Sequence, residues 1–432
     1  MGIHLALLVN IFILLLLFFG GIWIALALGI AGLIGLYLDT GIQAFSSIGL
    51  IGWNTSNDFV YTAIPLFILM GELIMHSGLS IRFYNGIAVW IRSVPGGLLH
   101  TNIISCAIFA GISGSSVATA VTIGTVAIPE MKRRGYDERL TLGSLAAGGT
   151  LGILIPPSIV MIIYGAMVEQ SIVKLFMAGI IPGILLSVLF MGYIFVKTFF
   201  DPSYSSGIEK KDMPFLAKLK VTLSSWPVYL IITIVIGGLY MGIATPTEVA
   251  ALGALSALIV GLIYKELKWS SFVKSLKNSI STTCMIMFII VGAQIYSFAL
   301  SHAGIPRAIS GWIISFELSP TVFFIILCIF YLILGCFLDG VSMMVLTLPV
   351  LYPTIYEMGF DPIWFGVILT ILIELGQITP PMGLNLFAIH GIAGGSISDV
   401  IIGSFPFCII MCIMIVILKI FPDIVLWLPR II

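Results

Sequence analysis

Long apolar runs follow one another along almost the whole chain, interrupted by glycine, proline and short polar stretches. A membrane-spanning helix needs about 20 mostly apolar residues, and most of these runs are long enough. The run 3–38 is too long for the apolar part of a signal peptide, so we expect two spans that meet near Gly20-Gly21. The longest polar stretch, 197–225, divides the chain, and Lys218 and Lys220 among apolar neighbours predict an amphipathic helix at the membrane surface.

A pattern of glycine and proline occurs twice, with an offset of 224 residues. Every proline of the window 111–182 has a proline 224 positions later, and four of its glycines have a matching glycine. Apolar residues match by chance in so apolar a chain, but glycine and proline do not. Paired interruptions of this kind are typical of secondary transporters and mark their binding sites. The matched pairs are Pro129/Pro353, Pro156/Pro380, Pro157/Pro381, Pro182/Pro406, Gly111/Gly335, Gly135/Gly359, Gly152/Gly376 and Gly179/Gly403.

The distribution of charge indicates that the two repeats have opposite orientations in the membrane. Cytoplasmic loops carry an excess of lysine and arginine. The loop 130–139 has four basic residues, whereas its repeat mate 354–363 has none. Residues 264–278 contain four lysines, whereas 40–54 contain no charged residue. Equivalent loops therefore lie on opposite faces, with loop 40–57 outside and residues 77–97 inside.

We therefore expect an all-α polytopic membrane protein made of two inverted repeats. In each repeat, a re-entrant helical hairpin precedes a helix that is broken in mid-membrane. We expect the first repeat to span 1–196, with its hairpin at 98–131 and its broken helix at 140–166. A cytoplasmic amphipathic linker follows at 197–225. We expect the second repeat to span 226–432, with its hairpin at 322–353 and its broken helix at 363–390.

Composition supports a membrane protein and argues against other classes. Of the 432 residues, 60% are hydrophobic and 9% are charged, against about 25% charged in soluble domains. The 19 basic and 19 acidic residues cancel, and without a basic stripe there is no sign of a nucleic-acid partner. The sequence has no phosphate-binding Gly-x-x-x-x-Gly-Lys-[Ser/Thr] loop and no His-Glu-x-x-His motif. We therefore do not expect an enzyme or an ATP-driven pump.

The first hairpin tip, Gly111 to Ser116, is rich in glycine and serine. Such residues are tolerated in a membrane where they are buried in protein or line a cavity, and their oxygens suit a hard cation such as Na⁺. Close packing of helices is the alternative explanation. The second tip contains Asp339, and a carboxylate within a span is a candidate functional group, although it could also serve as a structural partner. Glu374 is a candidate functional group for the same reason, whereas we favour a structural role for Glu72.

The proline pairs Pro156-Pro157 and Pro380-Pro381 predict the two helix breaks, because proline has no N–H and clashes with the preceding turn. A break frees carbonyl groups that can bind a cation. The half-helix that follows presents a positive N-terminus to an anion. Simple kinks without a ligand role are the alternative explanation.

Together these motifs closely resemble those of the large membrane subunit of the tripartite ATP-independent periplasmic (TRAP) transporters, over essentially the whole chain. The segments that carry the resemblance are Phe109, Gly111 to Ser116, Ile128-Pro129, Arg134 to Asp137, Ile155 to Ser158, Leu338 to Gly340, Gln377 to Phe387, Gly71 to Leu73 and Thr245 to Glu248. One departure is Gly152-Ile153-Leu154, where the family commonly has Gly-Pro-Ile, and the missing proline could loosen the first break.

The resemblance implies Na⁺-coupled uptake of an organic acid anion, such as a C4-dicarboxylate or a sialic acid, through the bacterial inner membrane by an elevator motion. It implies two partners, a periplasmic substrate-binding protein and a separate small membrane subunit of about four helices that we do not expect to be fused to this chain. A stand-alone anion carrier without a binding protein is the alternative. By motif position, the resemblance places one Na⁺ site at Ser113, Ser115, Gly148 and Thr150, a second at Gly335, Gly376, Thr379 and Met382, and substrate contacts at Ser113, Ser158 and Asp339.

Overall fold

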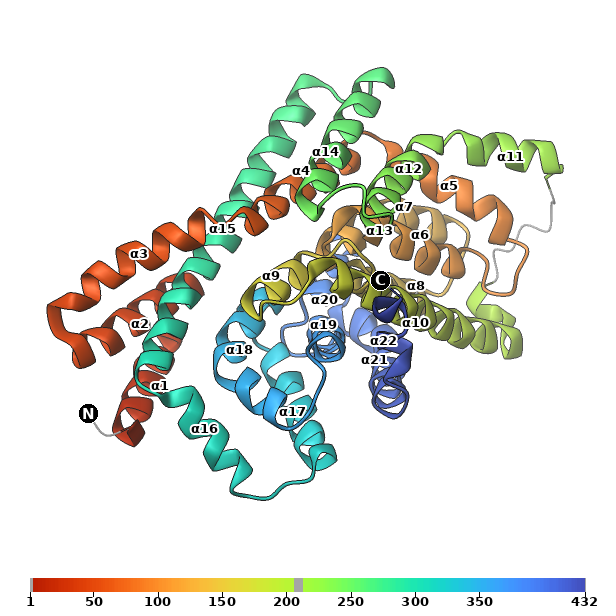
Figure 1. Ribbon diagram of the computed structural model, residues 1–432. Coiled ribbons are helices and arrows are strands. Elements are labelled where there is room, and N and C mark those ends of the chain that lie inside the picture. Colours follow the sequence, from red (N-terminus) through yellow and green to blue (C-terminus); the bar gives the residue numbers. More distant parts are fainter. Residues whose placement is uncertain (1–2, 206–212, 432) are drawn as a thin grey trace.

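The computed structural model describes residues 3–205 and 213–431, and in these residues all regular secondary structure is helical (Figure 1). Seven of the described helices are long and apolar enough to cross a membrane, or eight if one bent pair counts as a span. The prediction of an all-α polytopic membrane protein is therefore confirmed. Part of the predicted linker, 206–212, lies outside the described residues.

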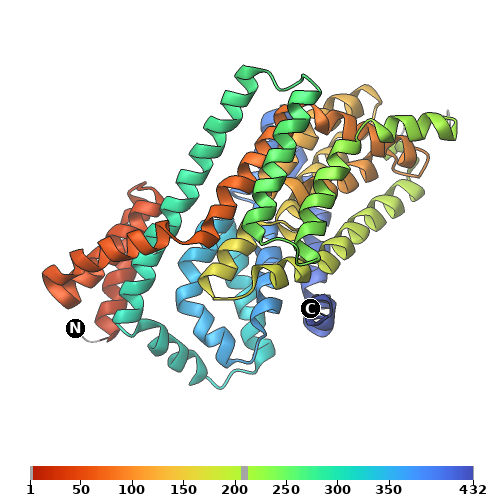
Figure 2. The ribbon, with the colours of Figure 1, turned by 45° about the horizontal axis from the view of Figure 1, so that its top comes forward.

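The chain begins with two helices, α1 (Ile3–Phe19) and α2 (Ile24–Thr40), which are separated where we expected, after Gly20-Gly21. The prediction of a loop over 40–57 is wrong, because α3 (Ala44–Ser56) fills most of it. This stretch has no charge or proline to stop a helix, and it packs against α15 (Trp269–His302). Figure 2 shows α15 beside these N-terminal helices as one long helix.

The remaining helices match pair by pair. The first repeat continues with α4 (Ala63–His76), α5 (Leu79–Ile91), α6 (Leu98–Ser113), α7 (Ser116–Arg133), α8 (Glu138–Leu154), α9 (Ile159–Met167) and α10 (Ile172–Phe200). The second has α15, α16 (Ile305–Ile314), α17 (Pro320–Gly335), α18 (Gly340–Glu357), α19 (Pro362–Gln377), α20 (Leu384–Ala393) and α21 (Ile397–Ile420). Between them lie α11 (Phe215–Leu223), α12 (Trp226–Ile232), α13 (Gly238–Tyr240) and α14 (Pro246–Ile263), and α22 (Asp423–Leu426) follows α21.

Each repeat contains a helical hairpin and a broken helix. The hairpins are α6–α7 and α17–α18, and the broken helices are α8–α9 and α19–α20. Figure 1 shows the two hairpins on opposite sides of the broken helices, as expected for inverted repeats. In the linker, the expected amphipathic segment forms α11, which packs on α5 and exposes Phe215 and Leu216. Its position at a membrane surface stays a prediction.

The matched glycines Gly135 and Gly359, and the aspartates Asp137 and Asp361 that are also 224 residues apart, have a local structural cause. Gly135 and Gly359 both adopt positive φ, 71° and 79°, in the turn between the hairpin and the broken helix. A residue with a Cβ atom rarely adopts this conformation. Asp137 and Asp361 then cap α8 and α19, because their carboxylates accept backbone N–H groups of the first helical turn. The repeat in the sequence therefore encodes the same turn twice.

Helix α8 lies at the centre of the protein, in contact with α6, α7, α20 and α21. In the span Glu138–Met167, which includes α8 and α9, 94% of the most apolar 18-residue stretch is buried. Helix α21 approaches α8 backbone to backbone: a Cβ atom on Gly143 would lie 2.0 Å from the carbonyl oxygen of Gly403, and one on Gly403 would lie 2.0 Å from that of Arg139. Small residues at a helix interface permit this approach.

We expect Gly143→Ala and Gly403→Ala to destabilise the protein, because each added methyl group would overlap a backbone oxygen. Overpacking of this kind costs about 1–3 kcal/mol, and thermal unfolding of the purified protein in detergent would measure it. Gly192→Ala in α10 is the matched control, because a Cβ atom there meets nothing within 4 Å. Equal melting temperatures for all three variants would contradict the close contact.

The proposed orientation can be tested with the repeat mates Lys132 and Tyr356, which both have exposed side chains. We expect Tyr356→Cys to react with a membrane-impermeant maleimide in intact spheroplasts, because we predict that the end of α18, where Tyr356 lies, faces outward. Lys132→Cys should react after permeabilisation and not before. The unsubstituted chain supplies the background from the native cysteines. The reverse pattern would show that the orientation is wrong.

Candidate functional site

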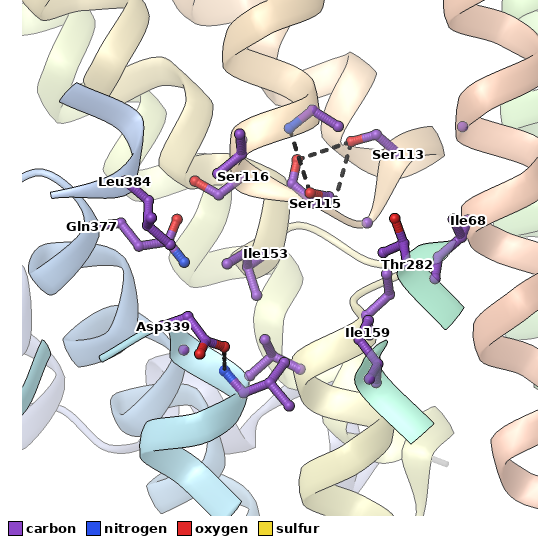
Figure 3. Close-up of a pocket in the computed structure, with 18 of the residues that line it drawn as sticks. Ile68, Ser113, Ser115, Ser116, Ile153, Ile159, Thr282, Asp339, Gln377 and Leu384 are labelled. Atoms are coloured by element: carbon purple, nitrogen blue, oxygen red, sulfur yellow. Dashed lines mark hydrogen bonds between the residues drawn. The ribbon is translucent and has the colours of Figure 1, made fainter. Parts of the chain in front are cut away.

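A cavity of about 460 Å³ lies where the two hairpin tips and the two broken helices meet (Figure 3). Helices α4 and α15, which lie outside the hairpins and the broken helices, form its remaining wall. The polar side chains that line it are Glu72, Ser113, Ser115, Ser116, Thr122, Thr282, Asp339 and Gln377. Most of the other lining side chains are apolar, so the cavity has the character of a ligand site with a few oriented polar groups.

Four helix N-termini converge on this cavity. The first residues of α7, α9, α18 and α20 all line it, at Ser116, Ile159, Gly340 and Leu384. Two of these helices follow a hairpin tip and two follow a proline break. Because a helix N-terminus carries partial positive charge and free N–H groups, the arrangement favours an anion.

The first hairpin tip brings three oxygen atoms together. The hydroxyl oxygens of Ser113 and Thr119 lie 2.5 Å apart, and the Ser113 hydroxyl donates to the carbonyl of Ser115 at 3.2 Å (Figure 3). The Ser115 hydroxyl accepts the backbone N–H of Ala118 and so caps α7. Gly152 of α8 packs against this group, because a Cβ atom there would lie 2.6 Å from the Ser115 carbonyl oxygen.

The other two residues predicted for the first Na⁺ site lie in α8 and make different contacts. Gly148 packs against Cys106. The Thr150 side chain is fully buried, and its hydroxyl donates to the carbonyl of Ala147 at 2.6 Å. The structure thus brings Ser113 and Ser115 together and places Thr119 with them, while Gly148 and Thr150 contribute to packing within and around α8.

The second hairpin tip packs on the second break through the residues predicted for the second Na⁺ site. A Cβ atom on Gly376 would lie 2.6 Å from the Cα atom of Gly335. The backbone N–H of Met382 donates to the carbonyl of Cys336 at 3.1 Å. The Thr379 hydroxyl donates to the carbonyl of Leu375 at 2.6 Å. All four predicted residues therefore lie at one junction, which is separate from the lining of the cavity.

The predicted substrate contacts differ in their position. Ser113 and Asp339 line the cavity, and Asp339 also caps α18 by accepting the N–H groups of Val341 and Ser342 through Oδ2. Ser158 is fully buried, and its hydroxyl caps α9 by accepting the N–H of Met161 at 3.3 Å. Ser158 therefore lies behind the cavity wall, under the half-helix that it caps.

The two intramembrane glutamates have unlike surroundings. Glu72 lines the cavity from α4 and accepts a hydrogen bond from Asn278 of α15 at 3.0 Å, so it joins two helices. Glu374 is fully buried, and its carboxyl group lies near the backbone of Ile153 and Leu154 rather than beside a basic side chain. Its repeat mate, 224 positions earlier, is Thr150.

Sequence reasoning missed Asn385, Gln377 and Thr119. Asn385 is fully buried, and its Nδ2 donates to the Ser116 hydroxyl at 2.7 Å and to the Ala146 carbonyl at 3.1 Å. It thereby joins the start of α20 to the first hairpin and to α8. Asn385 and Gln377 lie in the segment Gln377 to Phe387, which carries part of the family resemblance, and this position is the signal that indicates a functional role. Thr119 lies inside an apolar helix, and nothing in the sequence distinguishes it.

The polar groups of the site suit an ion of low charge better than a transition metal. Among the described residues, no group of three or more histidines, cysteines, aspartates and glutamates could hold a metal ion. The oxygens at the first tip are hydroxyl and carbonyl groups, which alkali and alkaline-earth cations prefer. In the part of the chain that the structure describes, the lining of the cavity includes two carboxylates and no lysine, arginine or histidine.

Comparison with known proteins gives a consistent result. The sequence profile of the family described as "Tripartite ATP-independent periplasmic transporter, DctM component" matches residues 11–424. The chain is 34% identical to the C4-dicarboxylate TRAP transporter large permease protein DctM of Pseudomonas aeruginosa, with 94% of each chain covered. It is 29% identical to the sialic acid TRAP transporter large permease protein SiaM of Vibrio cholerae, with 87% of each covered.

Two further comparisons concern length and fold. The isethionate TRAP transporter permease protein DctMQ of Oleidesulfovibrio alaskensis is 32% identical over 88% of this chain and 59% of its own length. The crystal structure of the YdaH transporter of Alcanivorax borkumensis superposes with a TM-score of 0.64 over 90% of both chains. At 14% sequence identity, this second likeness concerns the fold.

We expect Asn385→Ala to destabilise the protein, because it removes a buried link between α20 and the first hairpin. A buried hydrogen bond is worth about 1 kcal/mol, and thermal unfolding in detergent would measure the loss. Ser116→Ala and the double variant complete a double-mutant cycle. Strictly additive effects of Asn385→Ala and Ser116→Ala would show that the two side chains do not interact.

Proposed function

The chain belongs to the DctM family of large membrane subunits of tripartite ATP-independent periplasmic transporters, and on this premise we propose that it takes up an organic acid anion across the bacterial inner membrane, driven by a Na⁺ gradient. The single observation that carries the proposal is the convergence of four helix N-termini on one cavity at the meeting point of the two inverted repeats. Carboxylate groups are the anions that such termini bind well.

The composition of the cavity wall supports an elevator motion. One side consists of the hairpins and the broken helices. Their non-helical backbone forms hydrogen bonds within this group, as between the N–H of Met382 and the carbonyl of Cys336. The other side consists of α4 and α15, which are continuous where they border the cavity. A ligand between these two walls would be carried when one slides along the other, which is how inverted-repeat transporters expose a site alternately to the two sides.

The charge of the cavity supports coupling to a cation. An anionic substrate would share the cavity with Glu72 and Asp339 and with no basic side chain among the residues described as lining it. In a low-dielectric site, like charges repel strongly, so cations must accompany the substrate. The oxygen clusters at Ser113, Ser115 and Thr119, and the packed junction of Gly335 and Gly376, are the places where we propose that Na⁺ binds.

We propose two protein partners. One is a small membrane subunit, which fits the family name "tripartite" and the relative DctMQ, of which this chain matches 59%. The other is a periplasmic binding protein that delivers the substrate. The relatives are named for C4-dicarboxylate, sialic acid and isethionate, so the substrate that we propose is a small organic acid anion of this range.

We expect proteoliposomes with this chain and its small subunit to take up a labelled C4-dicarboxylate or sialic acid when an inward Na⁺ gradient and the cognate binding protein are both present. The measurement is accumulated label with time. Liposomes with K⁺ in place of Na⁺, and liposomes without binding protein, are the controls.

Uptake without the binding protein would replace the proposal with a stand-alone carrier. Uptake that follows a proton gradient and ignores Na⁺ would show that the coupling ion is wrong.

A further inference from the structure

The cavity must hold a carboxylate without the help of a basic side chain, if the proposed function is correct. Its described lining contains Glu72 and Asp339 and no lysine, arginine or histidine. The groups that can receive a carboxylate are therefore neutral N–H and O–H donors. The helix N-termini supply such donors, but they are available to a ligand where no side chain of the protein already occupies them.

Three of the four N-termini at the cavity have a side-chain cap. Ser115 caps α7, Ser158 caps α9, and Asp339 caps α18. In each case, the side-chain oxygen accepts an N–H group of the first turn. Asp339 brings a full negative charge to its helix end and would repel the carboxylate of a substrate there.

The N-terminus of α20 is different. The capping position is Gly383, which has a φ of 39° and no side chain. Among the described residues, no acceptor is recorded for the backbone N–H groups of Leu384 and Asn385. Leu384 lines the cavity, and α20 has ten residues, so its positive end is long enough to matter and faces the ligand space.

A second, independent feature lies beside this helix end. Gln377 lines the cavity from the last turn of α19 and is 7% exposed. Its Oε1 is buried without a hydrogen-bond partner, and no acceptor is recorded for its amide N–H₂ among the described residues. Buried amides normally have partners. Figure 3 shows Gln377 on the same side of the cavity as Leu384.

We propose that the uncapped N-terminus of α20 and the side-chain amide of Gln377 together form the subsite that holds the carboxylate of the transported anion. The backbone N–H groups of Leu384 and Asn385 and the amide N–H₂ of Gln377 donate to the carboxylate oxygens. Gln377 is thus a specificity-determining residue that replaces the arginine commonly used for carboxylates, and its neutrality keeps the cavity free of a fixed positive charge.

The test measures binding of unlabelled substrate to the detergent-solubilised complex of this chain with its small subunit, in NaCl. The probe is either a C4-dicarboxylate or a sialic acid, whichever the wild-type complex takes up. The second probe is the derivative of the same compound in which every carboxyl group is an amide. We expect the acid to bind the wild type and the amide derivative to bind it at least about tenfold more weakly, because one charge-assisted pair is lost.

The variants are Gln377→Glu, Gln377→Met and the control Gln294→Glu. Gln294 lies on α15, bonds to Tyr61 and does not line the cavity. We expect Gln377→Glu to weaken binding of the acid at least about tenfold, since a second carboxylate faces the first, and Gln377→Met to weaken it less. Gln294→Glu should bind as the wild type does. Melting temperatures without ligand verify that Gln377→Met is folded.

Wild-type affinity in both Gln377 variants, or equal binding of the acid and its amide by the wild type, would overturn the proposed subsite while leaving the proposed transport function intact. Failure of the wild-type complex to take up any carboxylate would overturn the transport function and the subsite with it.

Discussion

The absence of water in a lipid bilayer is the constraint on which this structure depends. A backbone that leaves the helical path in lipid has no partner for its N–H and C=O groups, yet two helices of the chain are broken, at Pro156-Pro157 and Pro380-Pro381. The solution is to place each break against a hairpin tip. The bond from the Met382 N–H to the Cys336 carbonyl, and the contact of Gly111 with the Pro156 carbonyl, show this pairing in the two halves.

The pairing of tips with breaks also produces the site. A tip and a break each end in a helix N-terminus, so two of each give four N-termini around one space. The two repeats use this geometry unequally. The first tip offers hydroxyl and carbonyl oxygens at Ser113 and Ser115, whereas the second offers the carboxylate of Asp339. The two repeats thus share a backbone arrangement but differ in the oxygen groups that they place at the site. This difference suits the simultaneous binding of cations and an anion.

Local patterns in the sequence predicted the order of helices, turns and breaks well. They did not predict contacts between segments that are distant in the sequence. Gly135 with Asp137, and Gly359 with Asp361, are visible in the sequence because a turn and a cap need specific residues at specific positions. The segment 40–57 was misread because helix α3 depends on its contact with α15, more than 200 residues away. Thr119 and Thr282 reach the site through packing, which leaves no trace in the pattern around them.

The burial of α8 has a consequence for synthesis of the protein. The span that contains α8 is more deeply buried than the other described spans, and one of the main neighbours of α8 is α21, close to the C-terminus. The nascent chain therefore inserts α8 about 260 residues before the helix whose Gly403 fits against its Gly143 has been translated. Until then, the face of α8 that carries Gly143 has no α21 to pack against. Throughout this interval, the nascent protein lacks the close contact between α8 and α21.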